Sequence, residues 1–196
     1  MKSAIKWTVA ILCVLAVCVL WGVGVYNDLV EEQERVESEW AQVENQYQRR
    51  ADLVPNLVAT VKGYAKHEQE TLDQVVEARA KATQITVDPT NATPEQLAAF
   101  QSAQGELTQA LGRLLAIAEN YPDLKANQNF LDLQQQLEGT ENRIAIARQN
   151  FNDAARKYNT DLRRFPRNII ARIAGFEKKA YFEAEAAAHT APKVEF

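Results

Sequence analysis

The sequence has few of the residues on which catalytic and metal sites depend. It contains two histidines and two cysteines, and both cysteines, Cys13 and Cys18, fall within an apolar segment near the N-terminus. Because they lie five residues apart on one expected helix, they cannot form a disulfide with each other. No H-E-x-x-H motif occurs, and His67 and His189 are far apart, so a zinc site would lack ligands. We therefore predict no catalytic residues, no metal and no cofactor.

Glycine, proline and charge of a single sign are also scarce. Seven glycines and six prolines in 196 residues argue against a turn-rich β-protein, while abundant Ala, Glu, Gln, Leu and Arg favour long helices. The formal net charge is -4, and the two signs are mixed along the chain. Phosphate neutralisation needs a basic stripe, which is absent, so nucleic acid is not expected as a partner.

The longest uncharged run, Trp7 to Tyr26, predicts a transmembrane helix, because about 20 apolar residues cross the hydrocarbon core of a bilayer. Lys2 and Lys6 precede the run, and mostly acidic residues follow it. This bias predicts a cytoplasmic N-terminus and an exported remainder. The expected organisation is a cytoplasmic segment 1–6, a transmembrane helix 7–26, an exported bundle 27–187 and a flexible tail 188–196.

A cleaved signal peptide and a lipoprotein signal ending at Cys18 are the alternatives to a retained anchor. The first would have a shorter apolar core followed by an A-x-A-like site, and neither feature is present. The second would have a small residue before the cysteine, where this chain has Val17. Retention of the anchor is the better reading of the segment.

A heptad-like spacing of apolar residues from Leu29 to Tyr64 predicts a long first helix. We expect it to continue to about Ala82, with the eleven-residue step from Val61 to Leu72 as a stutter, and to reach about 80 to 90 Å from the membrane. Pro55 interrupts this helix and should cost the hydrogen bond to the carbonyl of Ala51, with a kink.

Three further helices are expected after a loop at Val87–Glu95, which we place at the membrane-distal tip. Thr93 is the predicted N-cap of a second helix that ends near Asn120. A third follows Tyr121-Pro122 and stops at Phe165-Pro166, and a short fourth extends from Arg167 to about Ala187. The predicted fold is all-α: an N-terminal transmembrane helix followed by an elongated up-and-down antiparallel bundle of three long helices and one short C-terminal helix.

Two blocks of sequence resemble the LemA family. They are Arg49-Arg50-Ala51-Asp52-Leu53-Val54-Pro55-Asn56-Leu57-Val58 and Glu119-Asn120-Tyr121-Pro122-Asp123-Leu124-Lys125-Ala126-Asn127, each followed by further matching positions. The resemblance covers nearly the whole chain. It implies a bacterial, single-pass, exported helical protein of the inner (plasma) membrane, without an established enzymatic activity or cofactor, and it suggests a role in envelope quality.

A polar residue interrupts the apolar seam of each of two helices. Arg50 occupies a seam position on the first, and Thr140, next to Glu141, does so on the third. We expect Arg50 to be buried against a carboxylate such as Glu141 and to fix the register of the helices rather than add stability. The residues expected to have structural or interaction roles are Arg50, Asp52, Pro55, Asn56, Tyr121, Pro122, Asn127, Glu141, Arg148, Tyr158, Asn159 and Phe196.

The chain ends in Val194-Glu195-Phe196, an apolar pattern that PDZ-type grooves read; a frayed tail is the alternative. The expected function is that of a membrane-anchored, non-catalytic exported scaffold or interaction protein of the bacterial cell envelope. An adaptor for an envelope protease or stress pathway, acting through this tail, is the alternative. The expected partners are membrane lipid around Trp7 to Tyr26, a second copy of the chain and an envelope protein.

Overall fold

The structure is a computed structural model that describes residues 2–65 and 67–183, with side chains from Ile5 onward. The predicted tail 188–196, including His189 and Phe196, lies outside the described residues. The described part is helical and contains no strand, which confirms the all-α class. The helices are α1 (Lys2–Tyr64), α2 (Gln69–Gln84), α3 (Pro94–Ala118), α4 (Pro122–Lys125), α5 (Gln128–Asp161) and α6 (Arg167–Ala174).

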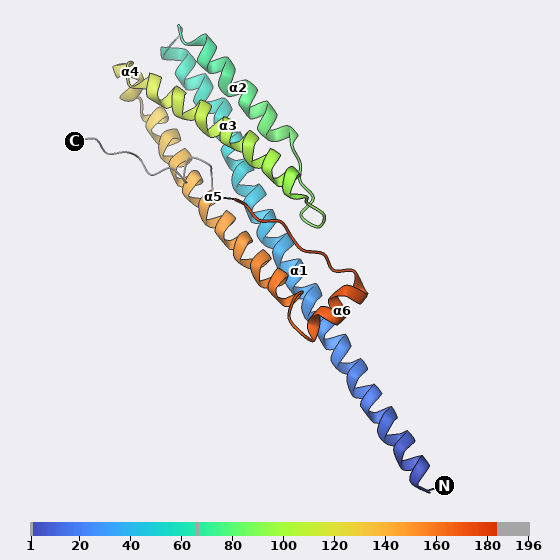
Figure 1. The fold of residues 1–196 in the computed structure, drawn as a ribbon. Coiled ribbons are helices and arrows are strands. Elements are labelled where there is room, and N and C mark those ends of the chain that lie inside the picture. The colour runs from blue at the N-terminus through green and yellow to red at the C-terminus, as the bar shows by residue number, and fades with distance from the viewer. Residues whose placement is uncertain (1, 66, 184–196) are drawn as a thin grey trace, which may run out of the picture.

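Helix α1 is a single helix of 63 residues, which at 1.5 Å per residue is about 95 Å long. Its N-terminal part projects beyond the rest of the molecule, and its C-terminal part runs through the bundle (Figure 1). Large apolar side chains in the projecting part are exposed, whereas from Val25 onward one face of the helix is buried. Among the described helices, α1 is the one that is long and apolar enough to cross a membrane, judged by length and composition.

The prediction that the first helix continues to Ala82 is wrong. Helix α1 ends at Tyr64, the chain reverses direction before α2 begins at Gln69, and α2 runs back along α1 (Figure 1). The eleven-residue step from Val61 to Leu72 is therefore a turn and not a stutter; both residues lie in the same core, so the spacing fits either structure. The part of α1 that follows the apolar segment is roughly 57 Å long at the usual rise, shorter than expected.

The other long helices complete an up-and-down bundle. Helix α3 begins with a capping box in which Thr93 and Gln96 satisfy each other's backbone N–H groups, so the predicted N-cap is confirmed. It runs toward the distal end, where α4 covers the helix ends, and α5 returns along α1 (Figure 1). The loop around Val87–Glu95 lies partway along the rod and not at its tip, because the reversal between α1 and α2 is the distal one.

The core has two parts. The distal part lies among α1, α2, α3 and α5, and its largest residues include Leu57, Leu72, Leu107, Leu114 and Phe130. The part nearer the apolar N-terminal end of α1 is centred on Trp40, whose ring lies 5.5 Å from that of Phe100 and 5.4 Å from that of Phe151. Toward the N-terminal end of this part, α1 and α5 are the only long helices among the described residues. Shorter segments from the C-terminal region therefore cover the apolar side chains there.

The fourth helix is shorter than predicted. Helix α6 ends at Ala174, and Gly175 follows in the left-handed conformation with φ 76°. Residues 176–183 have no regular secondary structure and run back toward the middle of the bundle (Figure 1). There Phe182 stacks on Trp40 with a centroid distance of 5.7 Å. The segment predicted as helix is therefore part of the core, because its aromatic side chain fills the space between α1 and α5.

Candidate functional site

A buried arginine links the helices at the middle of the rod. Arg50 on α1 is 1% exposed, and its Nη1 donates to Glu141 Oε1 on α5 at 2.8 Å and to Thr108 Oγ1 on α3 at 2.7 Å. Its Nη2 donates to the side-chain oxygen of Gln104 at 2.5 Å and to the carbonyl of Gln104 at 3.1 Å. The expected contact between Arg50 and Glu141 is present. Its role in fixing helix register stays a prediction.

Gln104 extends this network to α2. Its Nε2 donates to the carbonyl of Ala82 at 3.1 Å, near the end of α2, where helical carbonyls lack intrahelical partners. We did not identify Gln104 or Thr108 from the sequence. Gln104 does carry a signal: it stands between Phe100 and Leu107 on the apolar seam of α3, at a position whose spacing calls for an apolar residue.

Pro55 lies inside α1 and removes the hydrogen bond that Ala51 would otherwise accept. Arg79 on α2 replaces it, because its Nε donates to the carbonyl of Ala51 at 2.8 Å. The lost backbone bond predicted from the sequence is thus compensated by a side chain from the neighbouring helix. The proline leaves the carbonyl of Ala51 free to accept a hydrogen bond from α2, so it contributes to the pairing of α1 with α2.

Residues of the second block that resembles the LemA family, Glu119–Asn127, connect the helices at the distal tip. Tyr121 donates from its hydroxyl to Glu68 at 2.9 Å, and Pro122 is the first residue of α4. Asn127 is the N-cap of α5, accepting from the backbone N–H of Phe130 at 3.1 Å, and its Nδ2 donates to the Tyr64 hydroxyl at 2.9 Å. The structure therefore brings Tyr121 and Asn127 to the turn between α1 and α2.

Asp52 and Asn56 lie outside these networks. Both are exposed on α1; Asp52 accepts from Gln48 at 2.8 Å, and the carbonyl of Asn56 accepts from Thr60 at 2.8 Å. These contacts are local to one helix. The two side chains therefore present polar groups to the surface beside Pro55.

Two asparagines on α5 bind the backbone of the C-terminal segment. Asn152 accepts from the N–H of Phe182 at 2.9 Å and donates to its carbonyl at 3.0 Å. Asn159, seven residues later, accepts from the N–H of Lys179 at 2.9 Å and donates to its carbonyl at 2.8 Å. Arg148 packs over the ring of Phe182 at 4.8 Å. The sequence identified Asn159 and Arg148 but missed Asn152, although the repeat Phe151-Asn152 and Tyr158-Asn159 places both amides on one face.

Tyr158 is fully buried beside this segment. Burial, followed by the charges of Glu37, Glu32 and Glu177, raises the pKa of Tyr158 to about 12. Its hydroxyl lies 3.4 Å from Gln33 Oε1, and Lys179 Nζ lies 6.0 Å from its ring centroid. The phenol stays neutral at physiological pH, so it serves as a packing residue and a weak hydrogen-bond donor and cannot act as a general base there.

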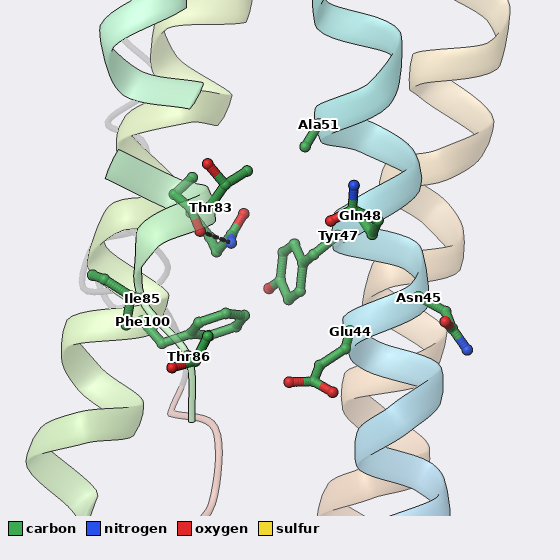
Figure 2. Close-up of a pocket in the computed structure, with 11 residues that line it drawn as sticks. Glu44, Asn45, Tyr47, Gln48, Ala51, Thr83, Ile85, Thr86 and Phe100 are labelled. Atoms are coloured by element: carbon green, nitrogen blue, oxygen red, sulfur yellow. Dashed lines mark hydrogen bonds between the residues drawn. The ribbon is translucent and has the colours of Figure 1, made fainter. Parts of the chain in front are cut away.

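A groove of about 280 Å³ opens between α1 and the residues that connect α2 to α3. Figure 2 shows the rings of Tyr47 and Phe100 in its wall, packed edge to face with centroids 5.1 Å apart, and Glu44 and Thr86 at one side. Burial is the main cause that raises the pKa of the Tyr47 hydroxyl. In the part of the chain that the structure describes, no group of three or more His, Cys, Asp or Glu residues could hold a metal ion. The groove offers mixed polar and apolar contacts but no acid–base pair.

Comparison with known proteins gives a consistent result. The family model for the LemA family matches residues 39–196. The magnetosome proteins MamQ 1 and MamQ 2 of Paramagnetospirillum magneticum are 29% identical to this chain over 182 residues, covering 84% of it and 67% of each relative. Protein LemA of Metamycoplasma hominis is 26% identical over 162 residues, covering 83% of this chain and 70% of the relative. Because the family match takes in the Arg50 network, the distal tip and the asparagine contacts of α5, the chain belongs to the LemA family.

Proposed function

We propose that this protein is a membrane-anchored, non-catalytic scaffold or interaction protein of the bacterial cell envelope. The observation that carries the proposal is the continuity of α1, a single helix whose apolar exposed part leads directly into the buried seam of the bundle. A rigid connection of this kind sets the distance and orientation of the bundle relative to a membrane. A flexible linker would set neither.

The exposure pattern of α1 supports the anchor. Val9, Leu12, Val17 and Leu20 are each more than half exposed, and such a long apolar surface on a helix would be unfavourable in water. The lysines that precede the segment and the acidic residues that follow it favour a cytoplasmic N-terminus in the inner membrane and an exported bundle.

The polar contacts of the bundle support a structural role over catalysis. Arg50, Arg79, Asn152 and Asn159 each direct hydrogen bonds at a neighbouring helix or at backbone, so these bonds serve the fold itself. The names of the relatives state no reaction and no substrate. The alternative of an adaptor for an envelope protease is favoured by no contact of the described residues, since its tail lies outside them.

Photo-cross-linking of the full chain in its native membrane tests the proposal. A photoreactive residue replaces exposed Asp123 at the distal tip, exposed Gln84 at the end of α2, or buried Leu114 as a control. A scaffold should give reproducible links from the exposed positions, either to a second copy or to one envelope protein, and none from position 114.

The outcomes separate the partners. Self-links that recur at one position indicate a homo-oligomer, whereas a single foreign protein indicates a hetero-complex. If neither exposed position gives a specific link in membranes that retain the anchored chain, the scaffold proposal fails.

A further inference from the structure

Helix α6 lies at the end of the bundle next to the apolar part of α1. Figure 1 shows it lying across α1, unlike the long helices, which run along it. Arg167, its first residue, donates from Nη2 to Asp28 Oδ2 at 2.8 Å and from Nη1 to Asp161 Oδ2 at 3.3 Å. These two bonds fix the start of α6 at the level of Asp28, the first acidic residue after the uncharged run.

From there α6 extends its apolar contacts down the uncharged run itself. A Cβ placed on Gly22 would lie 3.5 Å from Cδ1 of Ile170, so the two residues are in direct contact. Ile170 also borders an apolar groove of about 420 Å³ whose other walls include Leu15 and Val19. Gly22 precedes Asp28 by six residues, or about 9 Å along the helix. If the run spans a membrane, Ile170 is therefore inside the membrane boundary.

The exposed face of α6 is apolar. Ile169 is 49% exposed and Ile173 is 79% exposed, and four residues apart on a helix they project from the same side. Phe165, just before the helix, is 81% exposed. Ala171, on another side of the helix, is buried against the bundle. The helix thus presents a small apolar surface that the rest of the described chain leaves uncovered.

Two cations border this surface. Arg163 and Arg172 are exposed, and neither has a salt-bridge partner among residues 2–65 and 67–183. This differs from Arg164 and Arg167, which both pair with Asp161. Exposed apolar side chains flanked by free arginines, on a helix that lies across the axis of a membrane span, are typical of helices that rest in a bilayer interface.

We propose that α6 is a second membrane contact of this protein. Ile169, Ile173 and Phe165 enter the acyl-chain boundary of the leaflet from which α1 emerges, and Arg163 and Arg172 bind phospholipid phosphates. This inference rests on the proposed membrane anchor. The occupant is the phospholipid of the anchor's own membrane, because the contact of Ile170 with Gly22 places α6 beside a segment that lipid already surrounds.

The consequence is a fixed orientation of the bundle. One helix crossing a bilayer leaves the attached domain free to rotate and tilt, whereas a second contact at the interface restrains it. The contact between α6 and the span lies at Gly22, where an added Cβ would be at van der Waals distance, 3.5 Å, from Cδ1 of Ile170.

Spin-label accessibility in the full chain tests this proposal. Cys13 and Cys18 are replaced by alanine, and the protein is reconstituted into vesicles of phosphatidylethanolamine and phosphatidylglycerol. A single spin label is then placed at Ile173. Collisions with oxygen, which concentrates in hydrocarbon, are compared with collisions with a water-soluble nickel chelate.

Three reference labels make the result decisive. Leu15 in the expected span should be strongly oxygen-accessible, and Asp123 at the distal tip should be nickel-accessible. Lys178 is a matched control near α6, because the chain has by then turned back to the level of Asn159. It should resemble Asp123.

We expect the oxygen-to-nickel ratio at Ile173 to be several-fold higher than at Asp123 and Lys178. If the ratio at Ile173 equals that at Asp123 and Lys178 while Leu15 is oxygen-accessible, the inference is overturned and the anchor stands. A nickel-accessible Leu15 would overturn the anchor and the inference together. In the double variant Arg163→Gln, Arg172→Gln, the oxygen-to-nickel ratio at Ile173 should fall. An unchanged ratio would show that the two arginines do not contribute to lipid binding.

Discussion

Replacement of Arg50 by methionine should destabilise the bundle more than any other single polar substitution on α1. The side chain is buried and its guanidinium donates to groups on two other helices. Methionine fills part of the volume but donates nothing. The amide oxygen of Gln104, itself 6% exposed as a residue, would lose its only donor in the described structure.

The magnitude follows from the groups left behind. Breaking a buried ion pair by removing one partner costs about 3–5 kcal/mol. Glu141 is 41% exposed at its side chain, so water can solvate the freed carboxylate and the cost should lie near the lower end of that range. The carbonyl of Gln104 retains a bond from Thr108 at 3.2 Å and adds little. A loss of roughly 3 kcal/mol lowers the Tm of a chain of this size by about 6–12 °C.

Thermal unfolding of the full chain in detergent micelles, followed by far-UV circular dichroism, measures this loss. Arg49 supplies the matched control, because it precedes Arg50 on the same helix and is exposed. Arg49→Met makes the same chemical change, and we expect it to alter the free energy of unfolding by less than about 0.5 kcal/mol. Arg50→Lys keeps the charge without the planar fork and should give an intermediate Tm.

Equal melting temperatures for Arg50→Met and Arg49→Met would refute this reasoning. That result would mean that the buried hydrogen bonds of Arg50 merely offset its desolvation. The register role has its own test. If Arg50 selects the alignment of the helices, the variant should also show faster hydrogen exchange in α3 and α5 than its lower stability alone explains.

Three further variants test other contacts. Arg79→Ala should lower the free energy of unfolding by about 1–2 kcal/mol in the native chain, and by less in a Pro55→Ala background, where the backbone regains its own donor to Ala51. Equal losses in denaturant unfolding of both backgrounds would contradict the replacement of the lost backbone bond by Arg79. Asn159→Ala should release residues 176–183, seen as faster amide exchange and proteolysis there, with about 2 kcal/mol lost; unchanged protection would show that Phe182 alone holds the segment. Burial raises the pKa of Glu32, so its negative charge lowers the stability of the folded chain once the pH has risen through that raised value. Glu32→Gln should therefore raise the Tm at neutral pH, and the difference should vanish below the ordinary pKa of a glutamate. A lower Tm of the variant at neutral pH would show that the ion pair with Lys157 outweighs burial.

Local patterns in the sequence predicted much of the fold. Heptad spacing identified the buried faces of α1, α3 and α5, because a helix of 3.6 residues per turn places seam residues on one side whatever it packs against. Thr93 was readable as an N-cap, since an N-cap satisfies backbone groups within three residues of itself. A charged residue in an apolar seam also indicated that Arg50 must meet a polar partner.

The sequence by itself therefore determined the helical class, the apolar span and the faces that are buried. The tertiary structure decided that the chain reverses between α1 and α2. An eleven-residue step keeps the seam apolar in a continuous helix and in a turn alike, and only packing against α1 and α3 selects the turn. It also decided the path of residues 176–183. That segment has helix-forming residues, but the space between α1 and α5 near Trp40 is better filled by Phe182 and closed by Asn152 and Asn159 from α5. Local propensity is worth a few tenths of a kcal/mol per residue, and burial of one aromatic side chain with its backbone hydrogen bonds outweighs it.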